Sequence, residues 1–209
     1  YTQRTTCQGD SRRDARHFVK HSGPLHLAKT LSTGGAMFIR HAEPSDAGGI
    51  AAVQVAAWQS AYRGLMPDHV LDGLSVQAAK QRWRERIAEP WGHILVVERG
   101  DRIVGHAACG TTRDQDVDRE RVGEIYVLYV HPCAWRCGYG SALVDQCLAR
   151  LREEEFREVI LWVLQGNEQA IRFYQAAGFE ADGATQTKRR ADGTEMRLVR
   201  YRQRIMSID

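Results

Sequence analysis

The strongest constraint on the fold of this 209-residue chain is a glycine-rich turn, GYGS at 138–141, between an apolar segment and an amphipathic one. Before the turn, residues 124–130 (EIYVLYV) are β-branched, aromatic and aliphatic, which is typical of a buried strand. After it, Val144, Leu148 and Leu151 recur at the spacing of one helix face. The sequence therefore predicts a strand that turns sharply into a helix.

The same turn has the chemistry of an anion-binding loop. Gly138 and Gly140 lack a Cβ atom, so the backbone can approach a ligand closely. A helix that begins near Ser141 leaves its first N–H groups unpaired at the positive end of its dipole. Arg136 adds a cation. An ordinary tight turn would also explain the two glycines, and the lack of Gly-Lys-Ser/Thr or a third glycine disfavours a triphosphate or dinucleotide site.

A second pattern, NEQAIRFYQAAGF at 167–179, follows an apolar segment at 159–164. The nearly continuous apolar segment is typical of a central strand that is covered on both faces. Asn167 can cap a helix that begins at residue 168, and Gly178 can adopt the left-handed conformation that ends one. A capped helix packed on the core would account for these residues without any ligand.

The rest of the chain alternates in the same way, which predicts one α/β domain. The first 36 residues are rich in Arg and His with little apolar periodicity, so we expect 1–36 to be a flexible extension and 37–205 to be the domain. Further strands are expected at 38–40, 94–98, 102–109 and 196–202, and further helices from 44–46 to Gly64 and over 75–88.

Composition argues against several classes of protein. The net charge of +3 is small for this length, so we expect no nucleic-acid partner. The five cysteines lack the spacing of zinc ligands, which predicts no metal site and reduced thiols in a cytoplasmic protein. No apolar segment approaches the roughly 20 residues that cross a bilayer, so we expect no membrane association.

Taken together, the two motifs resemble those of the GNAT superfamily of N-acetyltransferases. The segment 128–140 resembles motif A, the segment 167–179 resembles motif B, and the resemblance extends over about 37–203. It implies the GNAT fold, in which helices cover both faces of a mixed, twisted sheet and two parallel strands splay apart to hold acetyl-CoA. The residues that carry the resemblance are Leu128, Val130, Pro132, Gly138, Gly140, Asn167, Ala170, Phe173, Tyr174, Gly178 and Phe179.

The resemblance also implies that acetyl-CoA is the co-substrate, with its pyrophosphate on the loop and its pantetheine beside the strand. The residues expected to bind it are Leu128, Tyr129, Val130, Arg136, Cys137, Gly138, Tyr139, Gly140, Ser141 and Asn167. Trp135 and Arg136 depart from the family, which often has Gln or Arg and then Gly at these positions. We expect Arg136 to adopt an ordinary right-handed or extended conformation.

Direct transfer to an amine requires two proton movements. The resemblance assigns Tyr174 as the acid that protonates the leaving thiolate. Glu124 is the expected base, acting directly or through water, and His106 is the alternative. By alternation along the strand, Glu124 should share a face with Tyr126 and Leu128 unless a bulge intervenes.

The acceptor pocket is expected to form from the first two helices and their connection. Trp58, Tyr62 and Arg63 lie there, with Tyr126 beside them, and Arg63 would favour a carboxylate or phosphate on the acceptor. The acceptor itself stays open, as a small-molecule or a peptide amine, and so does a homodimer. Two other classes are a non-catalytic CoA-binding module and a protein that docks partners through 1–36.

Overall fold

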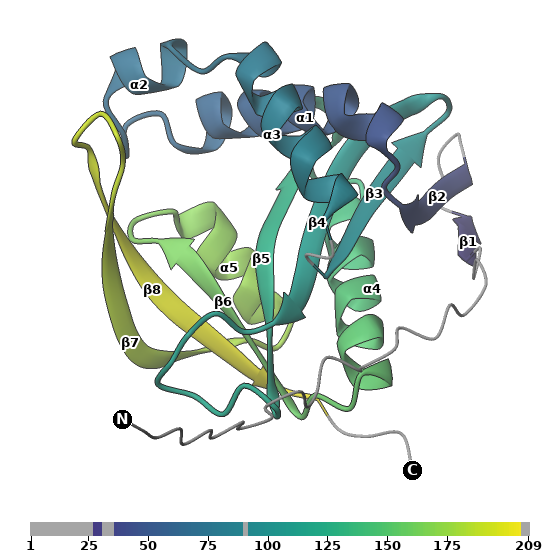
Figure 1. Ribbon diagram of the computed structural model, residues 1–209, viewed down its shortest axis with the longest axis vertical. Helices are drawn as coiled ribbons and strands as arrows, with labels where there is room; N and C mark the ends of the chain where they lie inside the picture. Colours follow the sequence, from purple (N-terminus) through teal and green to yellow (C-terminus); the bar gives the residue numbers. More distant parts are fainter. Residues whose placement is uncertain (1–26, 31–35, 90–91, 206–209) are drawn as a thin grey trace, which may run out of the picture.

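The computed structural model describes residues 27–30, 36–89 and 92–205. In this part of the chain, eight strands form one twisted sheet in the order β1-β2-β3-β4-β5-β6-β8-β7. Helices cover both of its faces (Figure 1), which confirms the expected α/β architecture with a mixed sheet. The strands are β1 (Leu27–Thr30), β2 (Ala36–His41), β3 (His93–Arg99), β4 (Arg102–Thr111), β5 (Val122–Val130), β6 (Glu158–Leu164), β7 (Glu180–Arg189) and β8 (Glu195–Arg204).

Two layers of helices bury the sheet. On one face, Ile50 of α1 and Trp83 of α3 pack with Val96 of β3. On the other face, Leu151 of α4 and the residues of α5 pack with Leu161 of β6. The helices are α1 (Ala47–Ala61), α2 (Asp68–Asp72), α3 (Val76–Ala88), α4 (Tyr139–Glu153) and α5 (Glu168–Ala176), with 3₁₀ turns at Pro44–Asp46 and Pro132–Ala134.

The parallel strands β5 and β6 separate along their length. They pair from Val122 with Glu158 to Ile125 with Leu161, and no further. Beyond that point β5 remains paired with β4, and β6 remains paired with β8 as far as Leu164. The expected splay of two parallel strands is therefore present, and it opens a gap in the middle of the sheet.

A bulge in β5 changes which side chains face which helices. The register with β4 shifts between Ala108 and Cys109, where two β5 residues, Tyr126 and Val127, both turn toward α1 and α3. Leu128 consequently packs on the α4 side. The expected alternation therefore holds for Glu124 and Tyr126 and fails for Leu128, because a bulge intervenes.

Several elements differ from those that the sequence predicted. Strand β1 lies inside the stretch 1–36 that was expected to be a flexible extension, and it pairs with β2. The start of the domain at Met37 stays a prediction. Residues 1–26 and 31–35, the rest of that stretch, lie outside the described residues. Helix α2 and strand β7 were not predicted, because α2 has five residues and β7 is a mostly exposed edge strand without an apolar repeat.

The loop at 112–121 connects β4 to β5, and buried charge holds it on the sheet. Arg200 of β8 is only 5% exposed. Its Nη1 lies 2.9 Å from a carboxylate oxygen of Asp114 and of Asp116, and its Nε lies 2.7 Å from Asp182. Because a buried guanidinium is stable only when it is paired, this cluster fixes the loop against β6, β7 and β8.

Candidate functional site

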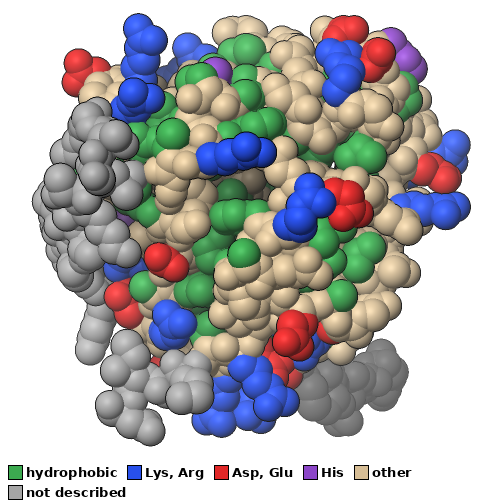
Figure 2. Space-filling view, turned by 180° about the vertical axis from the view of Figure 1, so that it is seen from behind, with side chains coloured by type: hydrophobic (Ala, Val, Ile, Leu, Met, Phe, Trp, Pro, Cys, Tyr) green, Lys and Arg blue, Asp and Glu red, His purple; other side chains and the backbone are tan. Residues whose placement is uncertain are grey.

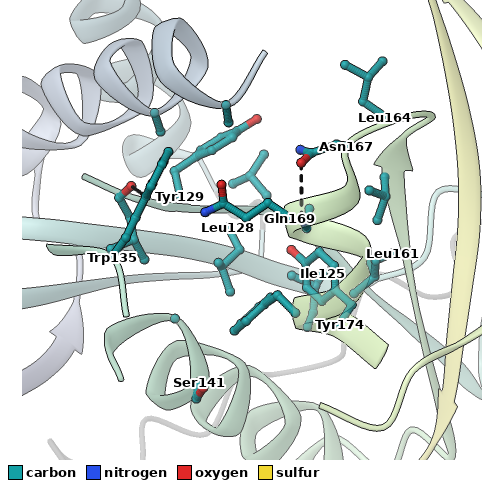
Figure 3. A pocket seen from close by; sticks show the side chains of 18 of the residues that line it. Ile125, Leu128, Tyr129, Trp135, Ser141, Leu161, Leu164, Asn167, Gln169 and Tyr174 are labelled. Atoms are coloured by element: carbon teal, nitrogen blue, oxygen red, sulfur yellow. Dashed lines mark hydrogen bonds between the residues drawn. The ribbon is translucent and has the colours of Figure 1, made fainter. Parts of the chain in front are cut away.

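A cavity of about 350 Å³ opens where β5 and β6 diverge. Its walls come from β5, β6, α5, the end of α1 and the beginning of α4. Ile125 and Leu161 lie where the pairing of the two strands ends. Figure 3 shows Tyr174 and Gln169 of α5 across the cavity from Leu128 and Trp135.

The beginning of α4 supplies the polar end of this cavity. The helix begins at Tyr139, two residues earlier than predicted, and its N-cap Gly138 has a φ of 83° that favours glycine. Among the described residues, none accepts a hydrogen bond from the backbone N–H groups of 136–141. Gly138, Gly140 and Ser141 line the cavity, so these donors and the helix dipole can bind an anion there.

Two loop residues named by the sequence turn away from the cavity. The ring of Tyr139 is buried in the core beneath α4. The thiol of Cys137 is exposed and lies 3.4 Å from the carbonyl oxygen of Trp135. Only the backbone of these two residues is therefore placed to contact a ligand in the loop.

Arg136 adopts a left-handed conformation with a φ of 60°. The expectation of an ordinary right-handed or extended conformation is therefore wrong. The conformation costs a residue with a Cβ atom about 1–2 kcal/mol, a cost that glycine would not have. Backbone strain of this kind is concentrated at ligand-binding and active sites. Arg136 lines the cavity, which agrees with this tendency.

Gly140 serves packing as well as ligand approach. A Cβ atom at this position would lie 3.2 Å from Cζ of Phe173 on α5. The glycine therefore lets the first turn of α4 lie directly against α5. This contact brings the anion-binding end of α4 next to the helix that carries Tyr174.

Asn167 and Trp135 define the two sides of the cavity beyond the loop. The Oδ1 atom of Asn167 accepts a hydrogen bond from the N–H of Ala170 at 3.2 Å and caps α5, which leaves its amide group for a ligand. The indole Nε1 of Trp135 donates to the carbonyl oxygen of Val130 at 2.7 Å. Val130 was expected to bind the co-substrate, and one lone pair of its carbonyl oxygen already accepts this hydrogen bond.

Tyr174 lines the cavity and is 9% exposed. Its ring packs edge-on against Phe173 and Phe179, at centroid distances of 5.0 and 5.9 Å. Burial raises the pKa of its hydroxyl well above the ordinary value. The group therefore stays protonated at neutral pH and is able to donate a proton or a hydrogen bond into the cavity.

Glu124 lies beside the cavity rather than in its wall, and it is 1% exposed. Arg113 of the 112–121 loop engages both of its carboxylate oxygens. The guanidinium carbon also lies 4.5 Å from the ring centroid of Tyr126, which does line the cavity. Burial raises the pKa of the Tyr126 hydroxyl to about 12, and this hydroxyl donates to the Thr111 carbonyl oxygen at 2.6 Å.

His106, the alternative base, does not line the cavity. It packs edge-on against Trp83 at 4.9 Å and lies 5.5 Å from the ring of Tyr129. It is fully buried, and neither ring nitrogen has a partner among the described residues. Burial lowers its pKa to about 3, so the ring is neutral at physiological pH.

Three of the four residues expected to bind the acceptor lie near the far end of the cavity. Tyr62 and Tyr126 line it, and Trp58 packs edge-on against Tyr62 at 5.1 Å. Arg63 does not line it, because its guanidinium is paired with Asp68 and Asp72 at 2.9 and 2.8 Å. An acceptor would therefore contact Arg63 only if those ion pairs opened.

The cavity also contains residues that sequence reasoning did not select. Trp162 follows Leu161 on β6, and Gln169 extends from α5 toward Trp135 in Figure 3. Trp162 had the appearance of a core residue in an apolar segment. No pattern in the sequence marked Trp162 as a cavity residue, because alternation along a strand does not show where two strands separate.

The structure gives further observations on possible partners. Within 27–30, 36–89 and 92–205, no cluster of three or more His, Cys, Asp or Glu side chains is arranged to hold a metal ion. No described helix is long and apolar enough to cross a bilayer. On the face drawn in Figure 2, Lys and Arg side chains are interspersed with Asp and Glu.

Comparison with known proteins places this site in a recognised family. The acetyltransferase (GNAT) family matches residues 57–179. A mycothiol acetyltransferase from Sanguibacter keddieii is 42% identical over 113 residues, which cover 52% of this chain and 36% of that protein. The matched part of the chain thus spans about a third of the length of this relative.

Solved structures share the fold at low sequence identity. The PaiA N-acetyltransferase of Thermoplasma acidophilum, in complex with coenzyme A, aligns with a TM-score of 0.64 at 16% identity, over 81% of this chain and 99% of that one. The acetyltransferase YncA of Salmonella typhimurium, with acetyl-CoA, aligns with a TM-score of 0.61 at 20% identity, over 83% and 96%. These two similarities establish the fold.

The burial of His106 predicts an acid-sensitive stability. The folded protein keeps the ring neutral down to a pKa of about 3, whereas the unfolded chain takes up a proton below about pH 6.5. Stability from this residue is present above pH 6.5 and is lost as the pH falls. Between pH 7.5 and 5.5 the wild type should lose about 1.4 kcal/mol more free energy of unfolding than His106→Leu, measured with urea. His69→Leu, at an exposed position, should behave like the wild type; equal losses for all three proteins would contradict the prediction.

The strain at Arg136 predicts that glycine stabilises the fold there. Arg136→Gly removes a Cβ penalty of about 1–2 kcal/mol and adds about 0.5–1 kcal/mol of chain entropy to the unfolded state. The free energy of unfolding should therefore rise by about 0.5 kcal/mol in a denaturant titration. Arg152→Gly, in the last turn of α4, should instead lower it by about 1 kcal/mol. A loss of similar size at both positions would show that Arg136 is not strained.

Proposed function

The chain belongs to the acetyltransferase (GNAT) family, and we propose that it transfers the acetyl group of acetyl-CoA directly to a primary amine. One observation carries this proposal. The unpaired N–H groups of 136–141, the gap between β5 and β6, and the buried hydroxyl of Tyr174 all meet at one cavity. A diphosphate, an extended chain and a leaving thiolate would each find a matching partner there.

The loop fits the diphosphate of a coenzyme A. Its N–H groups and the positive end of α4 would receive the phosphate oxygens, with Arg136 as the nearby cation. The pantetheine arm would follow β5 past Val130 and Leu128, with the amide of Asn167 on the opposite side. The coenzyme A and acetyl-CoA named for the two solved neighbours support this arrangement.

Acetyl-CoA supplies an acetyl group that is activated as a thioester. Tyr174 then donates a proton to the sulfur as it leaves, since a thiol with a pKa near 8.5 departs more easily when it is protonated. The Tyr174 hydroxyl is protonated across the neutral range, and its raised pKa favours return of a proton from solvent to the tyrosinate after each transfer. Its packing between Phe173 and Phe179 fixes the direction of the hydroxyl.

The acceptor amine must lose a proton before it attacks. An aliphatic amine with a pKa near 10 is mostly ammonium at pH 7, so it needs a base or a water that leads to one. Glu124 is a carboxylate beside the cavity, one residue before Ile125, the last β5 residue that pairs with β6. We assign it this role, with Tyr126 as the cavity wall in front of it.

The acceptor would enter from the side of Trp58, Tyr62 and Tyr126. It is a small-molecule or a peptide amine, and the similarity to a mycothiol acetyltransferase makes a mycothiol-related amine the first compound to test. The free thiols of Cys109, Cys133, Cys137 and Cys147 are compatible with a cytoplasmic protein.

Replacing Tyr174 by Phe tests the proposed acid. The variant keeps the ring and loses only the hydroxyl, so kcat should fall about 100-fold while the KM for acetyl-CoA changes little. The measurement is thiol release from acetyl-CoA with a panel of amines. Tyr201→Phe, a buried β8 residue outside the cavity, should keep wild-type kcat. A wild type that binds acetyl-CoA but acetylates none of the amines would instead indicate a non-catalytic CoA-binding module.

Replacing Glu124 by Gln tests the proposed base. At pH 7 the kcat/KM for an alkylamine should fall about 100-fold, and the defect should shrink as the pH approaches the pKa of the amine, where no base is needed. Glu120→Gln, at an exposed position of the 112–121 loop that precedes β5, should match the wild type at every pH. A defect of the same size at all pH values would mean that Glu124 acts only through its structural contact with Arg113.

A further inference from the structure

The contact between Glu124 and Arg113 is unusual in how its two sides are exposed. The side chain of Glu124 is 2% exposed, whereas that of Arg113 is 47% exposed. The carboxylate receives three hydrogen bonds among the described residues, and all come from Arg113: its backbone N–H at 2.9 Å, its Nε at 3.2 Å and its Nη2. A buried carboxylate is thus neutralised by a cation that arrives from the solvent side.

The same guanidinium also covers an aromatic ring of the cavity wall. It lies 4.5 Å from the centroid of Tyr126, a distance typical of a cation–π contact. Glu124 and Tyr126 both project from the β5 face opposite α4, because Gly123 and Ile125 face α4. A carboxylate and a ring face therefore form a two-sided site for a cation at the edge of the cavity.

The backbone on both sides of Arg113 is held in place. The N–H of Thr112 donates to the carbonyl oxygen of Val122 at 3.2 Å. On the other side, Asp114 accepts hydrogen bonds from Arg200 at 2.9 Å and from the indole of Trp162 at 3.1 Å. Departure of the guanidinium therefore requires only rotation of the Arg113 side chain, without movement of the loop.

We propose that the site formed by Glu124 and Tyr126 binds the ammonium group of a cationic acceptor, and that Arg113 occupies this site in the free protein. The inference rests on the proposed function, because it places the acceptor amine beside the residue assigned to take its proton. A guanidinium and an alkylammonium both carry a positive charge and N–H donors. Either one satisfies the buried carboxylate, so binding of the acceptor exchanges one cation for the other.

Arg200 shows what a purely structural pair looks like in this chain. Its side chain is 6% exposed, and it joins carboxylates of two different segments. The ion pair between Arg113 and Glu124 joins residues that are only 11 positions apart in the chain, and the Arg113 side chain is 47% exposed. The exposed guanidinium can be replaced from solution, whereas the buried one cannot.

The test replaces Arg113 with Gln in the full-length chain and measures acceptor kinetics with alkylammonium substrates. Partial occupation by Arg113 reduces the apparent affinity for the acceptor in proportion to the fraction of time for which the site is open. If Arg113 occupies the site about nine-tenths of the time, the KM for the acceptor should therefore fall about tenfold in the variant. Methylguanidinium should compete with the acceptor in Arg113→Gln at concentrations that leave the wild type unaffected. The KM for acetyl-CoA should not change.

Two further variants complete the experiment. Arg40→Gln removes another guanidinium that pairs with a buried carboxylate, Asp46, and it should leave the acceptor KM unchanged. Arg113→Lys keeps the charge with fewer donors and should give an intermediate KM, which provides a result even if Arg113→Gln fails to fold. Increasing concentrations of an alkylammonium ion should raise the melting temperature of Arg113→Gln more than that of the wild type.

The outcomes separate the inference from the proposed function. A wild type that acetylates no amine contradicts the proposed function. A wild type that turns over, with Arg113 variants whose acceptor KM is unchanged or higher and with no competition by methylguanidinium, contradicts this inference alone. A fall in KM with anionic and cationic acceptors alike would also contradict it, since a cation site cannot favour both.

Discussion

The functional part of this molecule depends on the point at which β5 and β6 stop pairing. The ladder ends at Ile125 and Leu161, and the next β5 residue, Tyr126, belongs to a bulge. Strands that separate leave backbone groups without a ladder partner, and such groups need another partner or a ligand. The gap is stable because each strand keeps its outer neighbour, β4 on one side and β8 on the other.

Helices α4 and α5 convert this gap into a site. Gly140 allows the first turn of α4 to contact Phe173, so that unpaired N–H groups and the Tyr174 hydroxyl reach one cavity from opposite sides. The loop that precedes α4 is strained at Arg136, which carries both a positive φ and a positive charge. Glycine at this position would relieve the strain but would also remove the positive charge from the cavity lining.

Buried charge organises the other edge of the cavity. Arg200 fixes the loop at 112–121 through Asp114 and Asp116, and Arg113 from that loop covers Glu124. The two guanidinium groups differ in exposure, 6% against 47%, so one is part of the framework and the other is accessible to solvent and its ions. The buried carboxylate of Glu124 is thus in contact with a cation that is itself accessible to solvent.

Motif spacing in the sequence indicated several of the residues that line the cavity. The glycines at 138 and 140 and the Asn167 cap follow from short-range rules of turns and caps, whereas Tyr174 was named through the resemblance to the family motif. The cavity lining by Trp135, Trp162 and Gln169 could not be located in the sequence, because it depends on which strands separate and how far. Arg63 shows the converse case, a residue expected at the site that pairs with two neighbouring carboxylates instead.

The sequence by itself determined the α/β class, the order of the long apolar strands and helices, and the family motifs, because these follow from periodicity and from turn residues that act over a few positions. Only the tertiary structure decided the polar edge strands β1 and β7, the short helix α2, the bulge at Tyr126 and the pairing of Glu124 with Arg113. A bulge is created by register with a neighbouring strand, and an ion pair is created by the loop that folds over it. Both depend on contacts between segments, which a pattern along one segment does not contain.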